Sequence, residues 1–159
     1  MADQIIDIER RLELAAQELL KKWTLLTALI PATEIFIQRD TSHAVKYPAV
    51  TIQAINFAEF GLHSGWYRGP LQLSGLTYRE DDKTRGTLKQ ILGALRAWAQ
   101  QTDLDTQFNA TAIAKATATA LDVNDASLEG AAFDASEDKK QEEVLTLACL
   151  VRPTQATTT

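Results

Sequence analysis

The stretch IIDIERRLELAAQELLKKWTLLTALIP, residues 5–31, decides the first part of the fold. Its apolar residues recur at spacings of three and four, which places them on one face of a helix: Ile5, Ile8, Leu12, Ala15, Leu19, Trp23, Leu26 and Ile30. The pattern predicts one long amphipathic helix from about Ile5 to Ile30, with Asp3 as its N-cap. Pro31 ends it, because proline has no amide hydrogen and disfavours a helical residue before it. Charged residues fall elsewhere around the helical wheel: Glu9, Arg10, Glu13, Glu18 and Lys21.

Short strands are predicted after this helix. Residues 34–39 (EIFIQR) form the first strand candidate, and residues 49–60 form a second one with a bend near Ala54, where the alternation of apolar residues changes phase. A third strand is expected over residues 66–79, interrupted by Gly69-Pro70. The connection between the second and third strands is too short for a crossover, so they form an antiparallel hairpin.

A second helix is predicted after the hairpin. The polar cluster Arg79–Thr84 closes the hairpin and caps the helix, which extends to about Gln101. Its apolar positions again step at helical spacing: Leu88, Ile91, Leu92, Leu95 and Trp98. Gly86 and Gly93 weaken this helix, and we expect them to allow close packing against the sheet.

The last third of the sequence predicts a mixture of elements. Asp103–Asn109 fits a helical turn, Ala110–Ala120 fits either a helix or a strand, and Gly130–Ala135 fits a strand. Glu142–Arg152 is a long strand that is apolar on both faces, so it belongs in the interior of a sheet or under another subunit. The predicted class is α+β, with a mixed, mainly antiparallel sheet packed by an N-terminal and a central helix. Residues 1–152 form one domain, and residues 153–159 form a polar tail that we expect to be disordered.

The composition excludes several classes of protein. Apolar residues make up 45% and charged residues 23% of the 159 positions, with a net charge of −5, as in an ordinary globular protein. A DNA-binding protein would show a basic stripe, so we expect no sequence-specific nucleic-acid partner. The apolar runs are far shorter than the about 20 residues that cross a bilayer, and the N-terminus predicts no secretory signal. Cys149 is the sole cysteine, which fits synthesis in a reducing cytoplasm and an inert buried thiol.

The sequence predicts no catalytic, cofactor-binding or metal-binding residues. The two histidines, His43 and His63, lie in predicted loops without the further ligands that a metal site needs. Asp40-Thr-Ser-His43 has the residue types of a catalytic triad, but triads are built from distant segments. The acidic run Glu80-Asp-Asp82 fits the capping of a helix better than acid–base chemistry. We therefore expect a protein that is not an enzyme and needs no cofactor.

Two features favour binding to other proteins. The loop between the second and third strands gathers aromatic and apolar residues near a hairpin tip, which is typical of protein interfaces. The predicted contact residues there are Phe60, Leu62, His63, Trp66, Tyr67 and Arg68. The alternative for Trp66 is that its indole folds back over the sheet. The second feature is the acid excess of residues 122–143, with eight acids against two lysines. This segment is a solvated face, or it attracts a basic neighbour in an assembly.

The order of these elements resembles that of the tail-terminator (tail-completion) proteins of tailed bacteriophages. The resemblance is carried by five segments: LLTALIP (25–31), YPAVTI (47–52), residues 66–76, the helix at 87–98, and EVLTLACLV (143–151). It covers nearly the whole chain and lies in architecture and pattern, because the family has no short diagnostic motif. The chain departs from the family in the Ala/Thr/Asp-rich stretch Ala110–Ala135, which the family pattern does not require.

The resemblance implies a homohexameric ring in the tail or neck of a virion, made in the host cytoplasm. Such a ring caps the tail tube, stops tube polymerisation and joins the tail to the head connector. Its partners are other copies of itself, the tail-tube protein and the connector or neck protein, with the sheath protein added if the tail is contractile. The hairpin and the final strand are the expected sheet edges for these contacts, which adds Glu143, Leu145 and Leu147 to the predicted interface. Two alternatives are another neck or head-completion adaptor, and a small α+β enzyme or ligand-binding domain.

Overall fold

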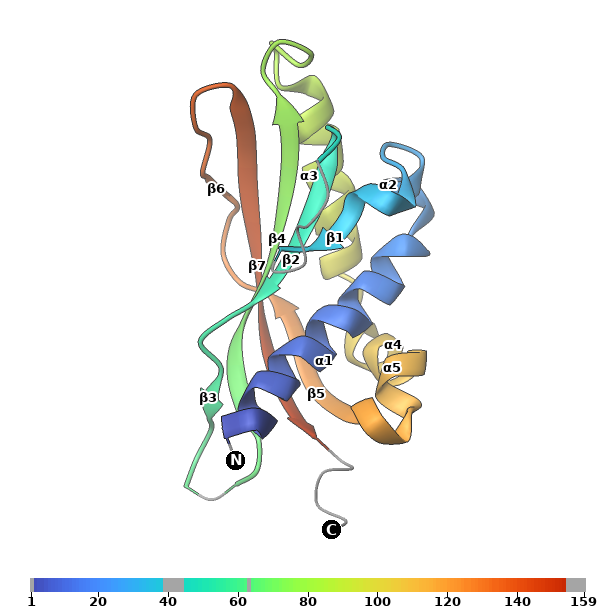
Figure 1. Cartoon of the computed structure of the whole chain (residues 1–159), viewed down its shortest axis with the longest axis vertical. Helices are drawn as coiled ribbons and strands as arrows, with labels where there is room; N and C mark the ends of the chain where they lie inside the picture. Colours follow the sequence, from blue (N-terminus) through green and yellow to red (C-terminus); the bar gives the residue numbers. More distant parts are fainter. Residues whose placement is uncertain (1, 39–44, 63, 154–159) are drawn as a thin grey trace.

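The computed structural model describes residues 2–38, 45–62 and 64–153, which fold around one seven-stranded sheet (Figure 1). The main path of the sheet runs in the order β1, β2, β4, β7, β5. These strands are β1 (Ile35–Ile37), β2 (Ala49–Ala54), β4 (Tyr67–Tyr78), β7 (Lys140–Pro153) and β5 (Leu121–Leu128). Two short strands lie off this path, β3 (Ala58–Glu59) beside β4 and β6 (Phe133–Asp134) beside β7. The pairing of β1 with β2 is parallel and the other pairings are antiparallel.

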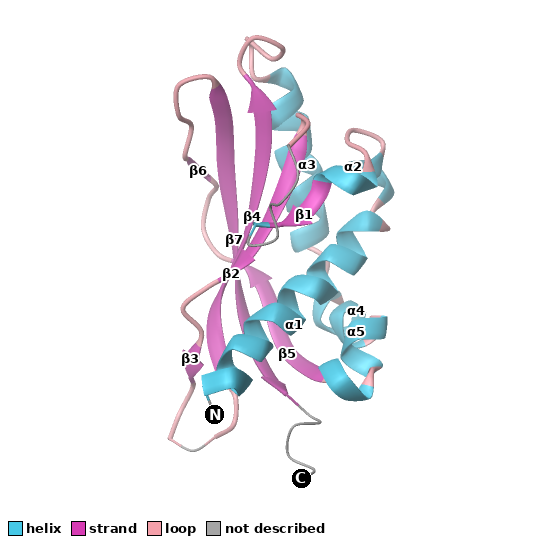
Figure 2. Cartoon of the chain, in the orientation of Figure 1, coloured by secondary structure: helices cyan, strands magenta, loops and turns pink. Residues whose placement is uncertain are grey.

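The helices gather on one side of this sheet (Figure 2). They are α1 (Ala2–Lys21), α2 (Thr24–Thr27), α3 (Gly86–Ala99), α4 (Leu104–Asn109) and α5 (Ala112–Lys115), with 3-10 turns at Ala32–Glu34 and Thr117–Thr119. The predicted α+β class, with an N-terminal and a central helix packed on a mainly antiparallel sheet, is confirmed. Within the described part of the chain, no helix is both long and apolar enough to cross a membrane.

The predicted first helix is correct in its apolar face and wrong in its length. Ile8, Leu12 and Ala15 are fully buried, as the periodicity requires. The helix ends at Lys21, because Trp23 adopts an extended backbone and its indole N–H donates to the carbonyl of Ala94 in α3, at 2.9 Å. The short helix α2 then restarts, and α1 itself begins at Ala2, so that Asp3 lies inside it.

The hairpin of β2 and β4 is confirmed, with Ile52 opposite Leu73 in an antiparallel register. The predicted second strand over residues 49–60 is wrong in its length, because β2 ends at Ala54 and pairing resumes only at β3, so the change of phase near Ala54 marks a break in the strand. The predicted interruption at Gly69-Pro70 is wrong, since β4 runs through both residues and pairs with β7 along its whole length. Pro70 is tolerated because it lies between the pairing of β4 with β2 and that with β3, where its nitrogen faces no strand partner.

Close packing of α3 against the sheet uses a strand glycine. A Cβ atom on Gly75 would lie 2.7 Å from the Leu92 side chain, so α3 approaches β4 where β4 has no side chain. The prediction that Gly86 and Gly93 serve this purpose is wrong. A Cβ on Gly93 would meet nothing within 4 Å, and one on Gly86 would meet only the Thr84 hydroxyl, at 3.5 Å.

The C-terminal third contains the element that the sequence did not predict. Residues 110–120 are helical or in turns, and β5 follows at Leu121–Leu128 and pairs with β7. The predicted turn at Asp103–Asn109 is present as α4, while the predicted strand at 130–135 is limited to β6. The long final strand is confirmed as β7 and lies inside the sheet, between β4 and β5. It extends to Pro153, and the rest of the predicted polar tail lies outside the described residues.

Candidate interaction surface

The first helix positions the base of the hairpin tip. The backbone N–H groups of Ala54 and Phe57, where β2 gives way to β3, donate to the carboxylates of Glu13 (2.8 Å) and Glu9 (3.1 Å). Glu13 is fully buried, although its place on the helical wheel put it away from the apolar face. The Phe57 ring packs on Gly69, where a Cβ atom would lie 2.5 Å from a ring carbon. These contacts join the base of the tip to α1 and to β4.

Sequence reasoning missed Glu9 and Glu13 as positioning residues. Carboxylates on a predicted helix are interpreted as solvent-exposed charges unless a partner is known. The partners of Glu9 and Glu13 are backbone amides more than 40 positions further along the chain. The one usable signal was the predicted bend near Ala54, because a strand that bends leaves amide groups in need of acceptors.

The loop at the tip is held by its own hydrogen bonds. The N–H of Phe60 donates to the carbonyl of Trp66 at 2.7 Å, and the hydroxyl of Ser64 donates to the carbonyl of Phe60. The N–H of Gly65 donates to the Glu59 carboxylate at 3.1 Å. Gly61 and Gly65 have φ values of +80° and +76°, a conformation that glycine adopts without strain. The described residues of the loop are therefore linked to one another across the turn.

The tip presents two apolar side chains to solvent. Leu62 is 89% exposed and Phe60 is 48% exposed, and the Arg68 guanidinium lies 5.2 Å from the centroid of the Phe60 ring. We call Phe60, Leu62 and Arg68 the tip surface. A leucine this exposed at the end of a hairpin has little to contact in its own chain, and burying it elsewhere releases water from apolar area.

The other residues predicted at the tip are less exposed. Trp66 is half-buried, and the Arg152 guanidinium stacks 4.6 Å from its ring, so the structure favours the alternative in which the indole folds back. Arg152 is held in turn by Asp122 at 3.2 Å. Tyr67 packs against the main core. His63, like His43, lies outside the described residues.

The second half of the predicted interface, on β7, is wrong for the folded chain. Leu145 and Leu147 have no exposed area, because their side chains point into the core beneath the helices. Glu143 is partly exposed and forms an ion pair with Arg85 at 3.2 Å. Since β4 and β5 flank β7 on its two sides, β7 is not the free edge that we expected.

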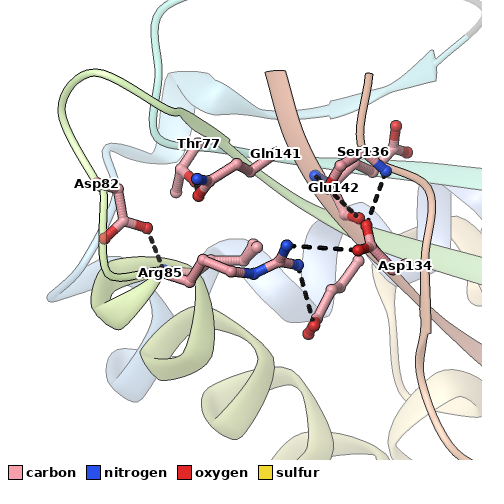
Figure 3. Close-up of polar contacts among 9 residues, drawn as sticks. Thr77, Asp82, Arg85, Asp134, Ser136, Gln141 and Glu142 are labelled. Atoms are coloured by element: carbon pink, nitrogen blue, oxygen red, sulfur yellow. Dashed lines mark hydrogen bonds and ion pairs between the residues drawn. The ribbon is translucent and has the colours of Figure 1, made fainter. Parts of the chain in front are cut away.

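A polar cluster joins the start of α3 to the β6 segment (Figure 3). The Arg85 guanidinium contacts Asp134 at 3.4 Å and Glu143 at 3.2 Å. Hydrogen bonds from the hydroxyl and N–H of Ser136, followed by the charge of Arg85, hold the pKa of Asp134 below its ordinary value. The arrangement is a set of satisfied pairs that ties β6 to the body.

Asp82 is the residue of the predicted acidic run that caps α3. Its carboxylate accepts from the N–H groups of Thr87 and Leu88, both at 2.9 Å. Burial of this carboxyl opposes its ionisation, but the two backbone hydrogen bonds, with help from the Thr77 and Thr87 side chains, outweigh burial and lower its pKa. The predicted capping role of residues 80–82 is thus confirmed at Asp82.

The described residues contain no cluster of three or more histidine, cysteine, aspartate or glutamate side chains that could hold a metal ion. Cys149 is buried, and burial, with the nearby charge of Asp125, raises the pKa of its thiol. The thiol is therefore protonated and inert, in agreement with the prediction from its apolar surroundings.

Comparison with known proteins gives no family for this chain. No protein-family model matches it, and no curated protein matches its sequence.

Proposed function

We propose that this chain is a virion structural protein, a phage tail terminator that caps the tail tube as a hexameric ring and joins the tail to the neck. The observation that carries the proposal is the tip surface. Its Leu62 is 89% exposed, on a loop whose base is joined to α1 through Glu9 and Glu13. A firmly positioned apolar projection is suited to contacting another subunit rather than to chemistry.

The element order gives further support. A leading helix, a short strand, a hairpin, a second helix on the same side of the sheet and a closing strand follow in the order that the resemblance to tail terminators implies. The added segment between α3 and β7 forms α4, α5 and β5, which extend the sheet and its helical layer without changing that order.

The proposed mechanism is assembly without covalent chemistry or a cofactor. One surface of each subunit contacts a different surface of the next, and such head-to-tail contacts close into a ring when the rotation permits. Full burial of a leucine or phenylalanine side chain contributes about 1.5–3 kcal/mol. Leu62 and the exposed half of Phe60 could therefore contribute a few kcal/mol at each contact. The tail-tube protein below the ring and the connector protein above it are the proposed partners, with sheath protein added in a contractile tail.

The test uses the full chain and the tail-tube protein encoded near its gene. Native mass spectrometry should detect a hexamer, either of the chain alone or after the tube protein is added, and electron microscopy should show shorter capped tubes. Leu62→Asp should remain folded and lose this assembly. The matched control is Leu25→Asp, since Leu25 is also an exposed leucine, at 55%, but lies on α2.

The outcomes separate the candidate functions. A chain that stays monomeric with tube protein present and leaves tube length unchanged is not a tail terminator. Binding to the connector without an effect on tubes would identify a neck adaptor instead. If Leu25→Asp and Leu62→Asp impair assembly equally, the tip surface is not the contact.

A further inference from the structure

Side-chain amides close parts of both outer edges of the sheet. On β1, the Gln17 side chain donates from Nε2 to the Ile35 carbonyl at 3.0 Å. On β5, the Asn109 side chain accepts from the N–H of Val123 at 2.7 Å and donates to the carbonyl of the same residue at 2.9 Å. Asn109 thereby occupies the hydrogen-bonding positions that a further strand would use. Natural proteins cover free strand edges in this way to prevent unwanted pairing.

The second half of β5 is left without such a cover. The register of β5 against β7 shifts between Val123 and Asp125, so the strand bulges there. The backbone N–H of Glu129 donates to the Thr146 carbonyl of β7. In an antiparallel pair, the backbone N–H and C=O groups of every second residue point to the same neighbouring strand. Ala126 and Leu128 consequently turn their backbone N–H and C=O groups away from β7. Within the described residues, no hydrogen bond meets these outward groups.

Hollows lie on both faces of this open segment. On the helix side, a hollow runs between the end of α3 and β5, lined by Gln101, Thr102, Asp105 and Asp125 among others. On the opposite face, a shallow groove has small residues at its base and charges at its sides: Pro70, Ser127, Ala148, Arg68 and Glu129. An added strand places alternate side chains on the two faces of a sheet, so both hollows would receive side chains from one incoming strand.

We propose that Asp125–Leu128 is a strand-addition site for an extended segment of another protein that carries a basic side chain. The outward backbone groups of Ala126 and Leu128 would pair with the incoming strand. A lysine or arginine of the incoming strand would reach the hollow that Asp105 and Asp125 both line. On the opposite face, the incoming side chains would lie in the groove that Arg68 and Glu129 border.

Charge complementarity favours an occupant from a different protein over the neighbouring segments of this chain. The extended segment next to this edge, residues 129–138, contains four acids and no lysine or arginine, and the last six residues, TQATTT, contain no charged side chain. Neither matches Asp105 and Asp125. A basic strand from a separate protein does, and the acid excess of residues 122–143 would favour its approach. The inference depends on the geometry of β5 and not on ring formation, so it goes beyond the proposed function.

The experiment uses three blocked octapeptides with the full-length chain. The first alternates threonine and lysine, the second alternates proline and lysine, and the third alternates threonine and glutamate. The threonine–lysine peptide should bind, and binding should slow amide hydrogen exchange at Ala126 and Leu128. The proline peptide has the same charge but lacks half of the backbone donors, so it should bind at least several-fold more weakly. The glutamate peptide should not bind.

The acidic pair is tested with isosteric variants. Asp105→Asn with Asp125→Asn should weaken binding of the threonine–lysine peptide by about threefold to tenfold, as expected for two partly exposed ion pairs. The control, Glu80→Gln with Asp81→Asn, removes the same charge from the turn before α3 and should have no effect. The site is rejected if the threonine–lysine peptide does not bind, if the proline peptide binds equally well, or if exchange at Ala126 and Leu128 is unchanged. Each of these outcomes would leave the Leu62→Asp assembly test unaffected.

Discussion

Replacing Gly75 by alanine should destabilise the fold, although alanine suits a β-strand better than glycine does. The new Cβ atom would lie 2.7 Å from the Leu92 side chain, 3.1 Å from Ile91 and 3.2 Å from Leu88. Real Cβ atoms do not tolerate the first distance, and the other two leave little room for Leu92 to move. Because three buried side chains of α3 meet at this point, Leu92 must rotate against its neighbours or the helix must shift away from β4. Overpacking of this kind costs about 1–3 kcal/mol.

Gly93→Ala is the matched control, since it adds the same methyl group to the helix that packs on Gly75. Gly93 is exposed, and a Cβ atom there would meet nothing within 4 Å. Alanine at an exposed helix position is more favourable than glycine by up to about 1 kcal/mol. The two substitutions should therefore change stability in opposite directions, although they are chemically identical.

Urea unfolding followed by circular dichroism measures both variants against the parent chain. For a small protein, each kcal/mol of stability corresponds to a change of about 0.3–1 M in the urea midpoint. Gly75→Ala should lower the midpoint and Gly93→Ala should raise it, with unchanged denaturant dependence. If Gly75→Ala is as stable as the parent, or if Gly93→Ala is the less stable variant, the close approach of α3 to β4 at Gly75 is not as described.

Further predictions concern titration, the strand edge and the thiol. Because the pKa of Asp82 is lowered in the folded chain, its contribution to folding stability is present above the ordinary pKa of 3.8 and is lost as pH falls through the folded pKa. Asp82→Asn should cost about 0.5–2 kcal/mol of stability at pH 7 and remove this acid-dependent loss from urea titrations. Asn109→Ala removes two hydrogen bonds to Val123 and should cost about 1–3 kcal/mol, with concentration-dependent association in light scattering. Gln107→Ala, on the same helix but bonded to other side chains, should do neither. The Cys149 thiol should react with a disulfide reagent only on unfolding, and rapid reaction of the native protein would contradict its burial.

Features that depend on local periodicity were predictable from the sequence. The apolar faces of α1 and α3 follow from residues three and four positions apart, and the predicted face residues whose burial the structure describes are buried in both helices, apart from the partly buried Leu19. The β2–β4 hairpin follows from two strand patterns and a short connection. The capping role near Asp82 follows from the acids placed before an apolar helical repeat. Each of these inferences needs only residues that are close in sequence.

Features that depend on distant partners were not predictable. The break after α1 arises because the Trp23 indole bonds to Ala94, and nothing near Trp23 in the sequence indicates that contact. Glu13 has the pattern of a surface carboxylate and is instead buried against the amide of Ala54. On the tip surface, the exposure of Leu62 follows from its position in the loop, whereas the half-burial of Trp66 depends on Arg152 at the far end of the chain.

The strand that sequence analysis missed also explains why the prediction for β7 was wrong. Leu121 and Val123 share one phase of alternation, while Ala126 and Leu128 share the other, so residues 121–128 lack the single period that marks a half-buried strand. The bulge between Val123 and Asp125 reconciles them, because one extra residue returns Ala126 and Leu128 to the core face. With β5 in place, β7 lies inside the sheet, and the outer edge belongs to β5. The same bulge separates the part of that edge closed by Asn109 from the part that remains open. A variant with Asn124 deleted should pair regularly with β7 and keep Ala126 and Leu128 on the core face, because Leu121, Val123, Ala126 and Leu128 would then share one phase of alternation. We therefore expect it to unfold at a urea concentration close to that of the parent, and a large loss of stability would contradict the bulge at Asn124.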